Sequence, residues 1–350
     1  MRHANVALFV PMNGCPHACS FCNQKSITGR AAQPTPRDVV SAARTALQSL
    51  GPAAGSAEIA FFGGSFTAVD RGYMLSLLEA AAPFVGSGAF SGIRISTRPD
   101  CVDPGILSLL KRYGVDAVEL GAQSMDDRVL ALNGRGHTAA RVEAAAALIR
   151  SSGLSLGLQM MTGLFGDTPA GARKTAERLA ALSPDCVRIY PAIVLKGTEL
   201  GRLFLSGAYL PPTLEETVEL CAGLLDFFEA RGIPVIRLGL HATPELERDR
   251  LAGPWHPAFR ELCESRRFLR RIRAELAGRA APKGAVTLRV NPRDLSAAIG
   301  QRKCNLRALS ALGYPAAAVG DPSVPERGFS IETTGGGERH AAQVAGASGV

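Results

Sequence analysis

The chain has 350 residues, of which 46% are hydrophobic and 20% charged, and its formal net charge is +8. This composition is typical of a globular protein with a sizeable core and excludes fibrous and largely disordered classes. The length suits two domains of about 150 residues each, or one larger α/β unit with a small second module. The first apolar run, Val6–Val10, is too short for a secretory signal, and longer apolar stretches fall short of the roughly 20 residues that cross a membrane. We therefore expect a cytoplasmic protein that does not contact a membrane.

Short β-rich runs alternate with helical segments through the first two thirds of the chain. The helix after residue 35 is clearly signalled, because Thr35 can act as its N-cap, Pro36 opens its first turn and Asp38 follows. A repeated strand–helix unit of this kind predicts a parallel sheet. We expect its strands at residues 6–11, 58–62, 92–97, 115–121, 154–160, 185–190 and 234–242.

One face of the predicted sheet carries polar residues. Strand positions alternate between polar and apolar, whereas a doubly wound sheet favours continuous apolar strands. The fold class is therefore α/β, with a partial or full parallel (β/α) barrel whose polar interior encloses a ligand cavity. The alternative for any single polar residue is an exposed edge position or an ion pair. The interior set comprises Arg94, Ser96, Arg98, Glu119, Gly121, Gln123, Ser155, Gly157, Gln159, Arg188, Tyr190, Arg237 and His241.

Three of the eight cysteines, Cys15, Cys19 and Cys22, lie within eight positions directly after the first strand. The carboxyl end of a barrel strand is where such enzymes place their chemistry. Three thiolates can bind three irons of a cubane iron-sulfur cluster and leave the fourth iron open to a substrate or cofactor. A structural zinc site is the alternative, and it requires a fourth ligand, for which His17 is available.

The cysteine spacing, with Phe21 before the last cysteine, resembles the signature of the radical S-adenosylmethionine (SAM) superfamily. The resemblance implies a [4Fe-4S] cluster held by the three cysteines and a SAM molecule on its open iron. An electron donor such as flavodoxin or ferredoxin then drives cleavage of SAM to a 5′-deoxyadenosyl radical, which abstracts hydrogen from a substrate. The segment FFGGSFT implies that Gly63 and Gly64 meet the SAM amino group, since glycine permits a close backbone approach. An ordinary turn is the alternative for this pair.

Residues 5–240 also resemble the radical SAM part of the Elongator catalytic subunit family, through STRPD at 96–100, VELGAQS at 118–124 and NGRGHT at 133–138. That family spaces its first two cysteines further apart and carries an acetyltransferase domain for which this chain has no room. The short spacing is similar instead to the coproporphyrinogen dehydrogenase branch. These resemblances imply SAM contacts at Gln123, Arg135 and Gln159, with Ser96 and Glu119 nearby, and catalytic roles for Glu119, Tyr190 and Lys196. A surface position is the alternative for Lys196, and we expect Cys101 to be a partly buried residue without a ligand role.

Residues 1–245 are expected to form the barrel, residues 246–330 a small basic α/β module, and residues 331–350 a flexible tail. The module should contain a helix at 257–279, the strand AVTLRV and two short helices at 293–312. From Arg260 to Arg307 there are thirteen Lys or Arg and four Asp or Glu, so the basicity is local. The long helix should present a cationic ridge to RNA through Arg266, Arg267, Arg270 and Arg271. A merely solvated face is the alternative.

A turn at Gly300, followed by Arg302 and Lys303, resembles the phosphate-clamping loop of KH domains without its second glycine. The resemblance implies that Arg302 and Lys303 also contact RNA. The sequence as a whole predicts a radical SAM enzyme that acts on RNA, with tRNA as the expected substrate and partner. Two alternatives stay open. One is a coproporphyrinogen-dehydrogenase-like enzyme whose Arg94, Arg188 and Arg237 bind substrate carboxylates. The other is a zinc-stabilised nucleic-acid-binding protein without catalytic activity.

Overall fold

The computed structural model describes residues 4–11, 15, 19–29, 32–86, 89–278, 283–333 and 340–342. It divides into two compact units, the first made of Met1–Leu214 with Ile233–Pro257 and the second of Glu215–Gly232 with Ala258–Val350. The division differs from the expected boundary at residue 245. The segment 215–232 was expected within the barrel, but it belongs to the second unit.

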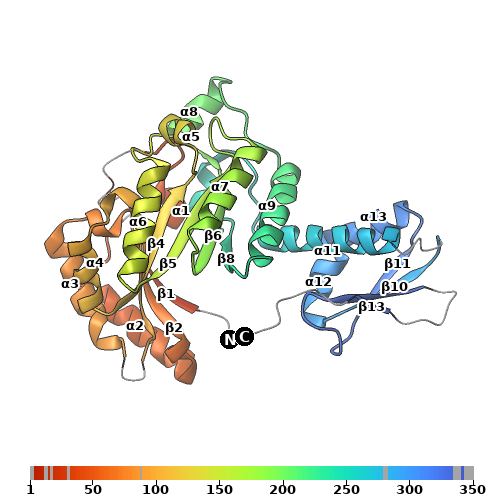
Figure 1. The fold of residues 1–350 in the computed structure, drawn as a ribbon, viewed down its shortest axis with the longest axis horizontal. Helices are drawn as coiled ribbons and strands as arrows, with labels where there is room; N and C mark the ends of the chain where they lie inside the picture. Colours follow the sequence, from red (N-terminus) through yellow and green to blue (C-terminus); the bar gives the residue numbers. More distant parts are fainter. Residues whose placement is uncertain are drawn as a thin grey trace. The chain divides into compact units, whose positions relative to one another are not determined.

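The first unit is built on a seven-stranded parallel sheet (Figure 1). All the expected strands are present, within a few residues of their predicted ends. In the described residues β1 and β8 are the edges of the sheet, so the barrel is partial. The strands, in their order across the sheet, are β1 (Ala4–Val10), β2 (Ala57–Gly63), β3 (Gly92–Thr97), β4 (Val115–Gln123), β5 (Ser155–Thr162), β6 (Cys186–Pro191) and β8 (Val235–Leu238).

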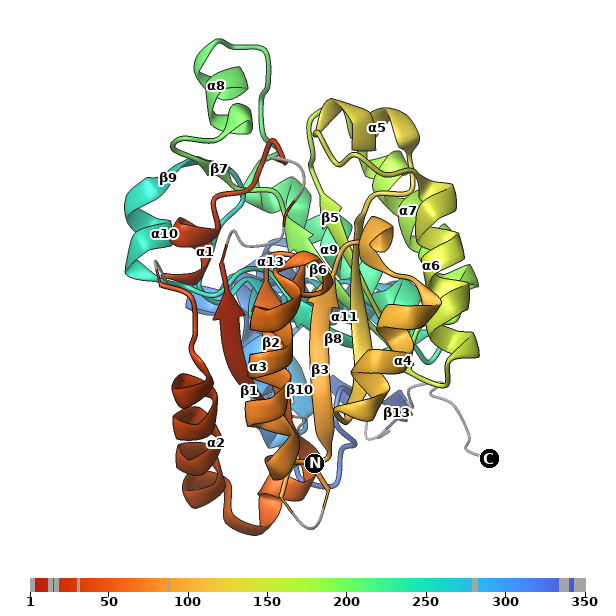
Figure 2. The ribbon, with the colours of Figure 1, turned by 90° about the vertical axis from the view of Figure 1, so that its left-hand side faces the viewer.

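Helices cover one face of this sheet, where the apolar strand positions such as Ile93, Leu120 and Leu158 are fully buried (Figures 1 and 2). The long helices along this face are α2 (Pro36–Leu50), α3 (Arg71–Ala81), α4 (Pro104–Arg112), α6 (Ala139–Ser151) and α7 (Pro169–Ala181). The start of α2 agrees with the sequence prediction. The Thr35 side chain accepts from the Asp38 amide, and the Asp38 carboxylate accepts from the Thr35 amide.

Shorter elements lie near the carboxyl ends of the strands. They are α1 (Gln24–Thr28), α5 (Asp127–Leu132), α8 (Glu199–Leu205) and α10 (Pro244–Asp249). A two-stranded antiparallel sheet of β7 (Val194–Leu195) and β9 (Arg250–Ala252) was not expected from the sequence. No helix in the described ranges is long and apolar enough to cross a bilayer.

The second unit contains a four-stranded sheet in the order β11-β10-β12-β13, in which β10 is parallel to β11 and antiparallel to β12. Its core joins Phe268 and Ile272 of the long helix to Leu288 and Phe329 of the sheet. The elements are α9 (Leu214–Glu229), α11 (Phe259–Gly278), β10 (Val286–Val290), α12 (Leu295–Ile299), α13 (Cys304–Ala311), β11 (Ala316–Gly320), β12 (Phe329–Thr333) and β13 (His340–Ala342).

The expected flexible tail begins too early. Phe329 and Ile331 alternate with more exposed neighbours and are buried, so β12 continues to Thr333. Residues 340–342 then pair with β12 as β13. The rest of the expected tail, at 334–339 and 343–350, lies outside the described residues.

Candidate active site

The three clustered cysteines follow β1, and all three are free thiols. Ser20 connects their loop to two other loops of the first unit. Its amide donates to Asn133 O at 3.1 Å and its hydroxyl to Asn133 Oδ1 at 2.6 Å, while its carbonyl accepts from the Leu200 amide at 2.7 Å. The loop is therefore anchored between Cys19 and Cys22. His17, the candidate fourth ligand of a zinc site, lies outside the described residues.

The thiols of Cys15, Cys19 and Cys22 lie close enough to influence one another. Burial, together with the neighbouring thiols of Cys19 and Cys15, raises the pKa of Cys22 to about 12. Desolvation and Cys19 also raise the pKa of Cys15, whereas the Ser65 amide and two arginines lower it. Neighbouring thiolates repel one another, so these thiols stay protonated until a metal ion displaces the protons. Metal binding at these thiols therefore releases protons.

Two guanidinium groups supply positive charge beside these thiols. Arg135 Nη1 lies 3.1 Å from Cys19 Sγ, and Arg98 Nη1 lies 4.0 Å from the same sulfur. Arg98 is held in place by Asp100, which accepts from its Nε at 2.9 Å, and by the Arg135 carbonyl. The same two arginines act to lower the pKa of Cys15, and a thiolate is the form that binds iron.

Within the described residues, no group of three or more His, Cys, Asp or Glu side chains converges closely enough to hold one metal ion. A cubane cluster makes a different demand, because each cysteine binds a separate iron atom. Three thiols that are neighbours without converging on one point suit such a cluster. The donor set, thiolates with adjacent arginines, also has the right chemistry for iron.

Polar side chains at the end of β4 lack partners in the described part of the chain. Gln123 Oε1 and Arg135 Nε are both buried and make no hydrogen bond. Both side chains lie over Gly121. A Cβ atom there would be 2.9 Å from Gln123 Nε2 and 3.4 Å from Arg135 Nη2. Gln123 also has a left-handed φ of 65°, a strained conformation that is common at ligand sites. These orphaned atoms, next to the cysteine loop, fit a polar ligand such as SAM.

His137 is a site residue that the sequence reasoning did not select, although it stands in the NGRGHT motif. Its side chain is buried, and neither ring nitrogen has a hydrogen-bond partner among the described residues. Burial and the nearby Arg135 and Arg98 lower its pKa to about 4. The ring is therefore neutral at pH 7. Its position two residues after Arg135 was the sequence feature that could have identified His137.

The two glycines of FFGGSFT bring β2 against β1. A Cβ on Gly63, whose φ is 116°, would lie 2.8 Å from Val10 O, and the Gly64 amide donates to that same oxygen at 2.9 Å. The close approach of the Val10 carbonyl is thus a structural reason for glycine at position 63. Contact of Gly63 and Gly64 with SAM stays a prediction.

A buried ion-pair chain crosses the interior of the partial barrel. Glu58 of β2 accepts from Arg94 Nε of β3 at 2.6 Å, and Arg94 Nη1 lies 3.4 Å from Glu119 Oε1 of β4. Arg188 of β6 donates to both Glu119 oxygens, at 2.6 and 2.8 Å. From β5, Gln159 Nε2 donates to Glu119 Oε2 at 2.8 Å. The polar interior expected from strand alternation is confirmed, but its charges are paired with one another.

This pairing changes the roles expected for several residues. Glu119 is almost fully buried, and both its oxygens are occupied by arginine donors, so it organises the interior. Ser96 joins the chain by accepting from Gln159 Nε2 at 3.2 Å. Arg94 and Arg188 are likewise paired with carboxylates, so two of the three arginines named for the coproporphyrinogen-like alternative are not free cations. The third, Arg237, donates from its Nε to Gly239 O at 2.8 Å.

Tyr190 and Lys196 lie in different environments. Burial raises the pKa of Tyr190, which neighbours Arg188 and Glu119 at the edge of the ion-pair chain. The Lys196 side chain is exposed, and its Nζ donates to Arg248 O at 3.2 Å. Lys196 therefore does not face the interior as expected, because the chain leaves β6 for the short β7–β9 sheet before reaching it.

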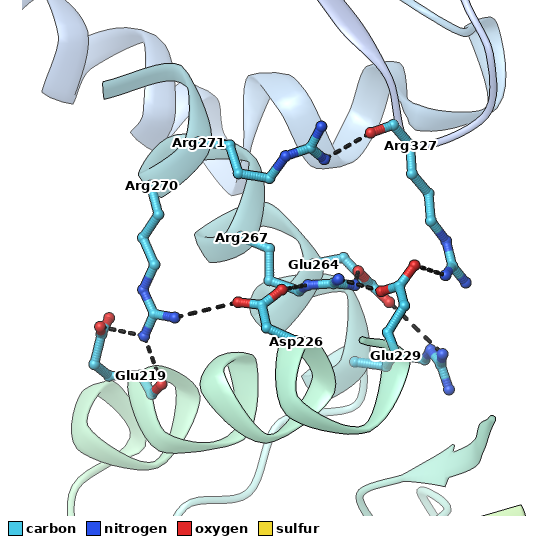
Figure 3. A network of polar contacts seen from close by, with 9 residues as sticks. Glu219, Asp226, Glu229, Glu264, Arg267, Arg270, Arg271 and Arg327 are labelled. Atoms are coloured by element: carbon cyan, nitrogen blue, oxygen red, sulfur yellow. Dashed lines mark hydrogen bonds and ion pairs between the residues drawn. The ribbon is translucent and has the colours of Figure 1, made fainter. Parts of the chain in front are cut away.

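The arginines of α11 do not form the expected free ridge. Their side chains meet acidic residues of α9 within the second unit (Figure 3). Arg267 alone contacts three carboxylates, and Arg271 donates to Arg327 O at 2.6 Å. The sequence did not show which helix would cover α11. The ion pairs are Arg266 with Glu215 and Glu219, Arg267 with Asp226, Glu229 and Glu264, and Arg270 with Glu219 and Asp226.

Two family models match the chain. A model described as the Radical SAM superfamily matches residues 9–179, and one described as the Radical_SAM C-terminal domain matches residues 184–270. Together they cover most of both the partial barrel and α11.

Curated relatives include a tRNA uridine(34) acetyltransferase of Methanocaldococcus jannaschii, 29% identical over 62% of this chain and 47% of its own length. Elongator complex protein 3 of Homo sapiens is 29% identical over 51% of this chain and 36% of its own. The chain spans about half the length of the first of these relatives.

Among solved structures, the archaeal Elp3 of Methanocaldococcus infernus has a TM-score of 0.58 at 20% identity, covering 80% of this chain and 64% of that one. This likeness supports the α/β half-barrel fold. The two family models show that the chain belongs to the radical SAM superfamily of enzymes.

Proposed function

We propose that this radical SAM enzyme binds a [4Fe-4S] cluster through Cys15, Cys19 and Cys22 and modifies RNA, with tRNA as its substrate. The observation that carries the proposal is the meeting of three thiols with Arg135 and Gln123, whose buried atoms lack partners. When bound, the cluster and SAM supply a 5′-deoxyadenosyl radical for hydrogen abstraction.

The residues around the site divide into three tasks. The cysteine thiolates hold the cluster, and Arg135 and Arg98 place positive charge beside the Cys19 sulfur. The orphaned Gln123 Oε1 and Arg135 Nε are available to the polar groups of SAM. A guanidinium fork suits a carboxylate in particular.

The buried ion-pair chain forms the floor beneath these residues. Gln159, Ser96 and Tyr190 lie along it, so we assign them to the walls of the SAM and substrate cavity. Glu119 holds Arg188 and Gln159 in place and acts on the reaction through them. Because the polar groups of the ion-pair chain satisfy one another, the interior does not need water molecules to do so.

The RNA substrate is supported by the relatives. The Methanocaldococcus jannaschii protein is named a tRNA uridine(34) acetyltransferase, and it shares 29% identity with this chain. Because the chain spans about half of that protein, the proposal concerns radical chemistry and does not include acetyl transfer. A cytoplasmic location, where tRNA occurs, accompanies this proposal.

The test is anaerobic reconstitution with iron and sulfide, followed by reduction and measurement of 5′-deoxyadenosine with and without tRNA. A reduced flavodoxin or ferredoxin serves as electron donor. We expect a bound iron-sulfur cluster and faster 5′-deoxyadenosine release when tRNA is added. A preparation that binds zinc in preference to iron contradicts the cluster, and release that does not respond to tRNA contradicts the substrate.

A further inference from the structure

The free positive charge of the second unit is concentrated on one loop. The arginines of α11 that were expected to bind RNA are largely neutralised by α9. By contrast, Arg302, Lys303 and Arg307 are exposed and have no ion pair within the described residues. From Leu295 to Gly320 the sequence contains these three cations and no Asp or Glu. An anionic partner therefore meets no repulsion along this segment.

The loop occupies a defined place between two helices. It joins α12 to α13, and these helices lie between the parallel strands β10 and β11 in the chain. Lys303 is the N-cap residue of α13, and Arg307 lies in the first turn of that helix. Arg302 stands just before them.

A buried asparagine fixes the shape of this loop. Asn305 Nδ2 lies within 3.1 Å of the carbonyl oxygens of Ser265, Ala297 and Ala298, which ties the last turn of α12 to α11. Gly300 is required for the same packing, since a Cβ there would come within 2.9 Å of Ser265 Oγ and closer still to Cys304 Sγ. The loop is thus held in one conformation before any ligand binds.

Arg302 and Lys303 adopt left-handed conformations with φ of 52° and 60°. Such a conformation is strained for a residue that has a Cβ atom. Glycine would remove this strain and would also remove the charge. Two strained cations on a pinned loop indicate that their side chains have a task outside the fold.

The edge strand β11 lies next to the two helices that flank this loop. In the described sheet β11 pairs on one side only, with β10, and it carries small residues such as Ala317. Both α12 and α13 pack beside it. Its open backbone edge offers hydrogen-bond donors and acceptors of the kind that unpaired nucleobases need.

We propose that Gly300–Lys303, Arg307 and β11 form a surface that binds an unpaired segment of RNA, with the cations on its phosphates and the strand edge toward its bases. The surface is small. KH domains hold about four nucleotides on a loop of this type, whereas double-stranded RNA domains reach across about 16 base pairs. The proposal rests on RNA being the substrate class and names the part of the RNA that is held.

The experiment measures binding of a short fluorescein-labelled oligouridylate to the full-length reconstituted protein by anisotropy. The test variant combines Arg302→Gly with Lys303→Gly, because glycine accepts both left-handed positions and the fold is not threatened. The matched control combines Arg231→Ala with Arg273→Ala, which removes two other exposed cations of the same unit. Thermal unfolding of both variants accompanies the titrations.

We expect the test variant to bind oligouridylate about tenfold more weakly, with a salt slope reduced by about 1.4, since each phosphate contact on a single strand contributes about 0.7. The control should bind within twofold of the parent protein. Test-variant binding within twofold of the parent overturns the proposal. Equal binding of duplex RNA, of the matching oligodeoxynucleotide or of anionic lipid vesicles overturns the assignment to unpaired RNA.

Failure of this proposal is distinguishable from failure of the proposed function. The parent preparation is assayed for iron and for 5′-deoxyadenosine release alongside RNA binding. Tight RNA binding that ignores the loop substitutions, with the cluster present, counts against the surface alone. A parent protein without a cluster counts against the radical chemistry, whatever its RNA binding.

Discussion

Arg188 holds both carboxylate oxygens of Glu119, at 2.6 and 2.8 Å, across the buried interior of the partial barrel. Glu119 also receives Gln159 and lies 3.4 Å from Arg94. Glu119, together with Glu58 on Arg94, thus balances two arginines that are themselves almost completely shielded from water.

Replacing that carboxylate by an amide should destabilise the first unit strongly. Glu119→Gln leaves Arg188 without its carboxylate partner, while Arg94 keeps Glu58, and breaking a buried pair costs about 3 to 5 kcal/mol. Thermal unfolding measures the loss. Glu143→Gln is the control, because its pair with Arg178 is about half exposed and contributes about 1 kcal/mol or less. Equal shifts of the unfolding temperature for the two variants would show that the buried ion pairs stabilise the protein no more than the exposed pair does.

Each of Cys15, Cys19 and Cys22 should be required for iron binding. Serine at any one position removes a thiolate that holds one iron of the cubane, so iron and sulfide content and visible absorption should fall after anaerobic reconstitution. Cys101→Ser is a demanding control, because Cys101 lies near Ser65 and Arg98 at the same end of the sheet. If the Cys101 variant loses the cluster as well, our assignment of three ligands is incomplete.

Gln123→Ala should weaken SAM binding without removing the cluster. The loss of a buried hydrogen-bonding amide predicts a Kd about tenfold higher, equivalent to about 1.4 kcal/mol. Anaerobic calorimetry with the reconstituted protein measures it, and Gln48→Ala, on the exposed side of α2, is the control. Unchanged affinity in the Gln123 variant would place SAM elsewhere.

The stability of the first unit should depend on Asp167. Burial and the nearby Asp126 raise the pKa of Asp167 from 3.8 to about 6. The folded state therefore keeps a proton that the unfolded state has lost, and stability falls as pH rises from about 4 through 6. Asp167→Asn removes this dependence and should gain about 1 to 2 kcal/mol over the parent between pH 5 and pH 8. A constant difference between the two proteins across this range would contradict the raised pKa.

Arg267 should be the main electrostatic link between α9 and α11. Its side chain is only 11% exposed and meets Asp226, Glu229 and Glu264. Arg267→Gln leaves these carboxylates to repel one another and should cost about 3 kcal/mol, visible as faster amide hydrogen exchange in both helices. Arg293→Gln, whose pair with Glu326 is highly exposed, should leave that exchange unchanged.

Periodicity and turn chemistry were sufficient to predict the strands of the partial barrel and the start of α2. The sequence indicated only some members of the buried ion-pair chain. Arg94, Glu119 and Arg188 lie on the polar face of their strands, but the distances between them depend on strand register. Glu58 was the single charged residue in an otherwise apolar strand. A side chain's partner is a property of three-dimensional packing, which alternation does not encode.

The same limit explains the second unit. In α11 the apolar residues Phe268 and Ile272 are four positions apart, and both are buried, as helical spacing predicts. It did not show that α9, some forty residues earlier, would bring Glu219 and Asp226 to the arginines. Local charge counts therefore overestimated the cationic surface of α11, whereas Arg302 and Lys303, far from any acidic residue in sequence, stayed free.

The strand that leads into the cysteine loop lies at an edge of the described sheet. There β1 has a single neighbour, β2, and the Gly64 amide donates to the Val10 carbonyl at the end of β1. An edge strand is the first to separate when a sheet opens, so a cluster bound by the proposed cysteine ligands would also hold this margin of the barrel in place. Loss of the cluster in air should therefore loosen β1 first and leave the remaining strands paired.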